Sequence, residues 1–189
     1  HLADLGPNPG EDPKWPLDEA WAHFGANSYY EWFDRGLRLM YGEPTDLQDY
    51  LWKAHLTTYD QHRGFFEAVH HRMWSLTSGF GEWKINSAFP DIQWQLYDWF
   101  LRPMVSLYAI RKACAPFAIQ LSPLDRQVLV VNSTLADAPG LQARAVAYDM
   151  DLNVLTDQSL SVDLPANGVR ELFVLELPPS FVELPVYFV

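Results

Sequence analysis

Three stretches in the first part of the chain have apolar residues every three or four positions, which is the spacing of helices that bury one face. They cover residues 29–42, 45–79 and 104–115. Thr45 and Gln48 have the spacing of a capping box, which predicts that the middle helix starts at Thr45. The middle stretch is apolar on two faces, so we expect other elements to cover it on more than one side.

The pattern changes after Pro116, where apolar and polar residues alternate with period two. Turn residues such as Asn167-Gly168 separate the runs, and short alternating strands between regular turns predict an antiparallel sandwich of immunoglobulin type. We therefore expect a first domain at residues 1–115 and a second domain at residues 116–189. The predicted strands are 117–121, 127–132, 142–150, 154–164, 170–177 and 186–189.

Composition and charge narrow the classes of function. Of the 189 residues, 49% are hydrophobic, which is enough for a folded core, and the formal net charge of −11 argues against a surface for nucleic acid. No apolar run reaches the length of a membrane span, so no membrane partner is expected. Cys114 is the single cysteine, so neither an internal disulfide nor a cysteine metal cluster is predicted. The chain begins at His1 and ends in an apolar run at Val189, and we expect it to be a piece of a longer protein.

The stretch from Gly81 to Trp99 combines residue types that neither a core strand nor an ordinary surface loop needs. Residues 80–85 are predicted to form a buried strand, and a loop rich in tryptophan, asparagine and glutamine follows. Indole faces stack on the C–H face of a pyranose, and amides and carboxylates bond its hydroxyls, so this mixture predicts a sugar pocket. A helix–strand junction buried in a core explains the same composition, and the residues alone leave both interpretations open. The residues concerned are Trp83, Asn86, Trp94, Gln95, Tyr97, Asp98 and Trp99.

The same stretch resembles a motif of glycoside hydrolase family 2. In the branch of exo-β-D-glucosaminidases, β-mannosidases and mannosylglycoprotein endo-β-mannosidases, the last barrel strand and its loop read approximately W-x-x-N-x-x-(W/F)-P-x-x-x-W-(Q/H)-x-Y-D. Residues 15–25 and 41–60 also resemble that branch, and the likeness covers most of residues 15–150. The positions that match the motif are Trp83, Asn86, Phe89, Pro90, Trp94, Gln95, Tyr97 and Asp98.

This resemblance implies an α/β plus all-β fold, in which the last βα units of a (β/α)8 TIM barrel precede an immunoglobulin-like β-sandwich. It also implies a retaining β-glycosidase, in which one glutamate attacks the anomeric carbon and a second, about 5–5.5 Å away, protonates the leaving oxygen. Neither family glutamate has a match in this chain, so we expect both to lie upstream and the chain alone to be inactive. Glu11 lies outside the family motif, and Glu82 would face away from Trp83 on the predicted strand.

The resemblance gives the loop residues roles in substrate binding. Trp83 becomes the aromatic platform under the sugar, with core packing as the alternative. Asn86 bonds sugar hydroxyls, with a turn amide bonding its own backbone as the alternative. The remaining candidates either line the pocket or hold the local structure together; they are Trp94, Tyr97, Asp98 and His23, the last beside Trp21.

The expected partners are an oligosaccharide or glycoside substrate and the remaining domains of the parent enzyme. No cofactor is expected, and no metal either, because the histidines at 55, 62 and 70 have no acidic or cysteine neighbour at ligand spacing. The resemblance suggests an extracellular or periplasmic location, and Asn132 opens an N-glycosylation pattern. A non-catalytic carbohydrate-binding or interdomain packing module stays open as an alternative, as does one chain of a processed, assembled enzyme.

Overall fold

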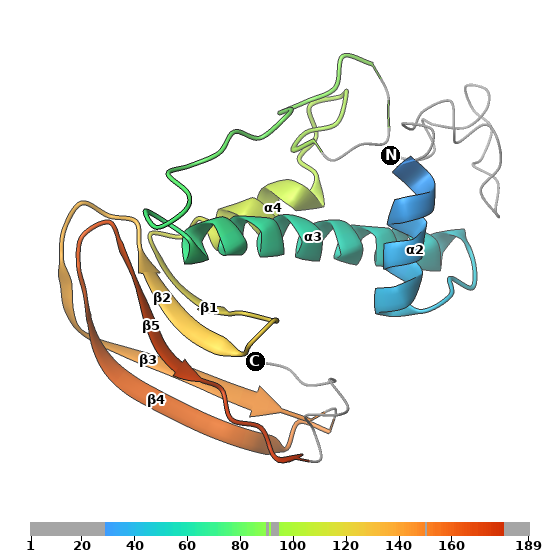
Figure 1. Ribbon diagram of the computed structural model, residues 1–189. Coiled ribbons are helices and arrows are strands. Elements are labelled where there is room, and N and C mark those ends of the chain that lie inside the picture. The colour runs from blue at the N-terminus through green and yellow to red at the C-terminus, as the bar shows by residue number, and fades with distance from the viewer. Residues whose placement is uncertain (1–28, 90, 92–94, 150, 180–189) are drawn as a thin grey trace. The chain divides into compact units, whose positions relative to one another are not determined.

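The computed structural model describes residues 29–89, 91, 95–149 and 151–179 (Figure 1). The chain divides into two compact units, each with its own internal contacts. The first runs to Phe65 and includes Gly81–Lys112, and the second combines Phe66–Phe80 with the chain from Ala113 onward. The long helix α3 crosses this division.

The three predicted helices of the first part of the chain are confirmed. They are α2 (Tyr29–Tyr41), α3 (Leu47–His71) and α4 (Val105–Ala113). Helix α3 ends before the predicted Gly79, because the chain turns after His71 and the Thr77 hydroxyl donates to the carbonyl of Val69 (2.8 Å). No described helix is long and apolar enough to cross a membrane.

The start of α3 is capped one residue later than the sequence predicted. Asp46, not Thr45, is the N-cap, because its Oδ1 accepts from the backbone N–H of Asp49 (2.9 Å). The Asp49 carboxylate reaches back to the backbone N–H of Thr45 (2.9 Å), one residue before the N–H that a capping box uses. Asp49 therefore occupies the N3 position that the prediction gave to Gln48.

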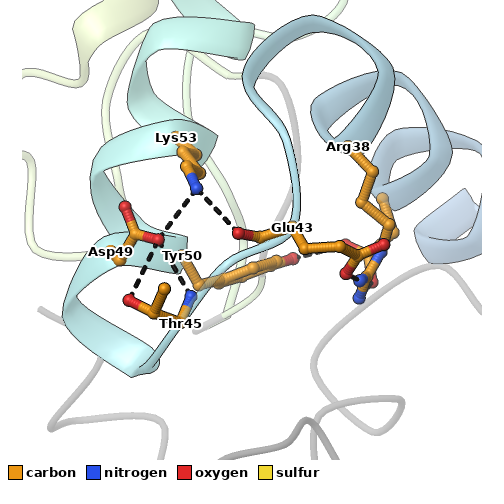
Figure 2. A network of polar contacts seen from close by, with 7 residues as sticks. Arg38, Glu43, Thr45, Asp49, Tyr50 and Lys53 are labelled. Carbon is orange, nitrogen blue, oxygen red and sulfur yellow. Dashed lines mark hydrogen bonds and ion pairs between the residues drawn. The ribbon is translucent and has the colours of Figure 1, made fainter.

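A polar network joins the end of α2 to this capped start (Figure 2). The Lys53 ammonium donates to the Glu43 carbonyl (2.9 Å) and to the Asp49 carboxylate (2.8 Å). The Tyr50 hydroxyl, on a side chain that is only 3% exposed, donates to Asp34 of α2 (2.7 Å). These bonds fix the short connection between the two helices from both sides.

The described part of the second unit contains five antiparallel strands in two sheets (Figure 1). The first sheet has the order β1-β2-β5 and the second pairs β3 with β4. All five lie within or overlap predicted strands, so the change to period two after Pro116 was correctly interpreted as β-structure. The bounds are β1 Phe117–Leu121, β2 Gln127–Asn132, β3 Ala138–Tyr148, β4 Val154–Leu164 and β5 Gly168–Val174.

Two apolar clusters join residues of both sheets. One contains Val128 of β2 with Ala145 and Ala147 of β3, and the other contains Val130 of β2 with Ala143 of β3. The three buried residues of β3 are alanines, at 0–5% exposure, and larger side chains such as Leu141 of β3 and Val162 of β4 pack around them.

Asn132 at the end of β2 is fully buried. Its amide nitrogen donates to the carbonyls of Ala136 (2.9 Å) and Pro165 (3.0 Å). Its amide oxygen accepts from the backbone N–H (2.9 Å) and hydroxyl (2.7 Å) of Thr134. The glycosylation pattern at Asn132 therefore falls on a structural amide, and its nitrogen is not accessible for a glycan in the folded chain.

The strand predicted at residues 80–85 is wrong in this structure. A strand needs a neighbour that shares a ladder of hydrogen bonds with it. Here the pairing is a single bridge between Asn86 and Tyr97. The described residues thus form helices in the first part of the chain and antiparallel sheets in the second. The assignment of the first part to a (β/α)8 barrel and of the second to an immunoglobulin-like sandwich stays a prediction. So does the domain boundary at residue 116.

Candidate functional site

The loop after residue 81 closes on itself through its backbone. The carbonyl of Ile85 accepts from the N–H groups of Leu96 (3.0 Å) and Tyr97 (2.9 Å). The N–H of Met104 then donates to the carbonyl of Leu96 (2.9 Å). Tyr97 bridges in parallel to Asn86 and antiparallel to Pro103, so it connects the two ends of the loop.

A buried polar cluster lies inside this loop. Ser87 and Gln95 are each 1% exposed, and the Asp91 side chain is also 1% exposed. The Gln95 amide donates to Asp91 Oδ1 (2.5 Å) and to the Ser87 hydroxyl, which itself donates to Asp91. The Lys84 ammonium lies 3.8 Å from Asp91 Oδ2. We call Ser87, Asp91 and Gln95 the loop triad.

A second polar contact closes the turn at residues 98–102. Asp98 accepts from the backbone N–H of Arg102 (2.9 Å) and from its Nε (2.6 Å). Burial opposes ionisation of Asp98, but the bonds and charge of Arg102 outweigh it and hold the pKa of the carboxyl below its usual range. The Arg102 guanidinium also lies over the Phe100 ring, 4.7 Å from its centroid. Asp98 therefore stabilises the turn.

The apolar side chains of the loop point outward. Trp83 is 78% exposed, Ile85 61% and Phe89 56%. The peptide bond between Trp83 and Lys84 is cis. The buried side chain among residues 83–89 is that of Ser87, so its polar bonds help to hold this segment.

The structure brings four of the predicted site residues into one loop. Trp83 and Asn86 are exposed, and Tyr97 and Asp98 are half-buried. The Asn86 amide donates to the carbonyl of Ser87 (3.1 Å), which is the local bond that the turn-amide alternative requires. Trp94 and His23 lie outside the described residues, as do Trp21 and Glu11. The assignment of these residues to sugar binding stays a prediction.

Sequence reasoning did not identify the inward role of Ser87 and Asp91. The loop triad has a spacing of four residues along a segment that is otherwise rich in apolar residues. That spacing was the available signal, but the described residues of the segment form no helix, so the spacing gave no reason to expect a shared direction.

Nothing in the described residues forms a ready metal site. No group of three or more His, Cys, Asp or Glu side chains is placed there to hold an ion. Burial lowers the pKa values of His55 and His70, and the His62 ring bonds to the carbonyl of Thr58 (2.8 Å). These helical histidines therefore serve packing and local bonding.

The chain is similar in sequence and structure to known glycosidases. Over 177 residues, 87% of the chain, it is 32% identical to an exo-β-D-glucosaminidase of Streptomyces avermitilis. Over 113 residues, 60% of the chain, it is 30% identical to a mannosylglycoprotein endo-β-mannosidase of Lilium longiflorum. The crystal structure of the Amycolatopsis orientalis exo-chitosanase CsxA superposes on 77% of the chain with a TM-score of 0.72 at 27% identity.

The chain spans only a part of these proteins. It covers 20% of the Streptomyces enzyme, 12% of the lily enzyme and 18% of the CsxA chain. No family model matches the chain. A further structure is a complex of a CsxA variant with PNP-β-D-glucosamine, so that relative binds a β-glucosaminide.

Proposed function

We propose that this chain, a segment like those of family 2 glycoside hydrolases, supplies the aromatic sugar platform of a retaining β-glycosidase. The substrates would carry β-glucosaminide or β-mannoside linkages, as the names of both relatives indicate. The two catalytic glutamates would lie in sequence outside this chain. The first part of the chain would then complete a (β/α)8 barrel, and the second would be an immunoglobulin-like sandwich.

The observation that carries this proposal is the exposure of Trp83. The Trp83 indole is 78% exposed on a loop that its own hydrogen bonds fix. Its apolar face is unfavourable in water, and stacking on a sugar ring would cover that face. A disordered aromatic would have to be immobilised on binding, whereas this one begins on a fixed backbone. Trp83 is also the first position of the family motif.

The other residues of the loop would bind and orient rather than react. The Asn86 side chain is exposed, three positions after Trp83, and can bond a hydroxyl by exchanging its present bond to the Ser87 carbonyl. Both oxygens of the Asp98 carboxylate accept hydrogen bonds from Arg102. Asp98 would therefore hold the turn at residues 98–102 rather than bond the sugar. Glu82 is half-buried, and no contact among the described residues assigns it a role in the chemistry.

The test measures the affinity of the chain for methyl β-D-glucosaminide and methyl β-D-mannoside. Binding is detected through the change in tryptophan fluorescence of the chain. These ligands lack an aromatic leaving group that could stack by itself. We expect Trp83→Ala to weaken binding about two- to tenfold, the value of a stacked aromatic pair. Trp52→Ala is the matched control, because Trp52 is another exposed indole, at 63%, on helix α3 and outside the loop. Equal effects of the two substitutions would contradict the platform.

A second experiment addresses catalysis. The chain alone should release no nitrophenol from PNP-β-D-glucosamine, whereas a longer protein that contains it and the glutamates should do so. A longer protein that binds glycosides without cleaving them would refute the glycosidase proposal.

The exposed apolar residues of the helices favour a second candidate, an interdomain packing module. Trp32 and Leu39 of α2 are 71% and 77% exposed, and Trp52 of α3 is 63% exposed. Under this alternative the chain would bind no glycoside, and Trp83→Ala would change only association with another domain.

A further inference from the structure

Contacts of the loop triad reach the segment that carries Trp83. Trp83, Ile85 and Phe89 are exposed. Contacts between described residues hold this segment at three points. Lys84 lies near Asp91, the Ile85 carbonyl accepts two backbone bonds, and Ser87 bonds to Asp91 and Gln95.

Gln95 is the residue on which these contacts converge. Its amide nitrogen bonds both other members of the triad, and its backbone carbonyl accepts from the hydroxyl of Ser106 in α4 (2.7 Å). The amide must face Asp91 with its nitrogen, because an amide oxygen there would repel the carboxylate. Gln95 thus links the Trp83 segment to a helix of the same unit.

We propose that Gln95 is a positioning residue for Trp83, acting through Asp91 and Lys84. The amide fixes the Asp91 carboxylate, the carboxylate attracts the ammonium of Lys84, and Lys84 is the residue next to Trp83. The effect of Gln95 on sugar affinity rests on the proposed function of Trp83. The effect of Gln95 on the position of the indole is independent of that function.

The cluster is sensitive to small changes because it is incompletely satisfied. Asp91 Oδ2 and Gln95 Oε1 are buried and have no hydrogen-bond partner among the described residues. The Asp91 and Gln95 side chains are therefore held by the few bonds described above, so the loss of one bond should disturb both side chains. Loss of the Gln95 amide would leave the Asp91 carboxylate to reorient and draw Lys84 with it.

The test exchanges charge within the pair. In Gln95→Glu two carboxylates face each other and share one proton, so the disturbance should grow as the pH rises and the shared proton is lost. The double variant Gln95→Glu/Asp91→Asn restores one amide and one carboxylate in reversed positions. Gln120→Glu is the matched control, because Gln120 is another buried glutamine, 4% exposed, on β1 of the other unit.

Two readouts separate positioning from general stability. The first is the indole N–H resonance of Trp83, assigned by its loss in Trp83→Phe, and the second is the affinity for methyl β-D-glucosaminide. We expect Gln95→Glu to shift the resonance and weaken binding about two- to tenfold. We expect the double variant to recover both, and Gln120→Glu to change neither.

Ser87→Ala provides a milder variant if Gln95→Glu does not fold. It removes the hydroxyl that joins the other two members and should shift the Trp83 resonance in the same direction. An unchanged resonance in the folded variants, or no recovery in the exchange, overturns the inference. If the unaltered chain binds no glycoside, the proposed function fails, and the resonance alone still decides whether Gln95 positions Trp83.

Discussion

Asn132 offers a sharp test of how the second unit is held together. Its fully buried side chain connects the end of β2 with the turns at Thr134–Ala136 and at Pro165, through the four hydrogen bonds described above. Asn132→Ala removes all four bonds and leaves a gap of amide size. The affected partners are backbone groups that differ in their access to water, so the loss varies from bond to bond.

The magnitude follows from these contacts. A typical hydrogen bond contributes about 1 kcal/mol net, and more when its partner stays buried without a replacement. Ala136 and Pro165 are exposed, so water can satisfy their carbonyls, whereas Thr134 is half-buried. We therefore expect Asn132→Ala to lower the free energy of unfolding by about 2–4 kcal/mol.

Asn132→Asp tests the bonds that the amide nitrogen donates separately from those that the amide oxygen accepts. It keeps an oxygen facing Thr134 but places a second oxygen against two carbonyls, where protonation would restore a donor. The folded chain would then hold a proton that the unfolded chain releases above about pH 4. Its stability should therefore fall as the pH rises from 4 to 7.

Urea unfolding followed by circular dichroism measures these changes. Asn153→Ala is the control, because the same amide is lost from an exposed turn, where it donates to Asp149 (2.9 Å). If Asn132→Ala costs no more than Asn153→Ala, the four bonds do not stabilise the unit and the reasoning is refuted.

Two further predictions concern helix α3. Asp46→Ala should lower the unfolding free energy by about 1 kcal/mol through loss of the N-cap, and Thr45→Ala by less; a larger loss for Thr45→Ala in urea unfolding would favour Thr45 as the cap. Burial lowers the pKa of His70, so the unfolded chain binds protons more readily and stability should fall as the pH drops below about 6.5. Urea midpoints at pH 7.5 and 5.5 should differ less in His70→Gln, and an equal difference would contradict this assignment.

Periodicity predicted the regular elements because burial repeats along them. The strand at residues 127–132 was predicted with its observed bounds, since four consecutive inward or covered apolar residues are bounded by turn residues. Strand β3 starts earlier than predicted, because Gly140 adopts a left-handed φ of 69° and donates to Asp163 (2.7 Å). The register shifts there, so the strand continues through residues that resembled a turn.

The candidate site was predictable in location but not in its internal organisation. The mixture of aromatic and amide residues in the sequence was enough to identify the loop around Trp83 as unusual. Which polar groups turn inward depends on where an irregular backbone leads, and no period encodes that. Ser87 and Asp91 are therefore recognised only through their burial and contacts.

The alanines of β3 have a consequence for how this protein can diverge. The methyl groups at positions 143, 145 and 147 are buried, so a larger side chain there would clash with its neighbours. Substitutions at these positions are therefore confined to side chains of similar size. Gln142 and Arg144, which flank Ala143 on the strand, are exposed and carry no such restriction. Sequence drift along this strand should therefore alternate between slow and fast positions, following the pleat of the backbone.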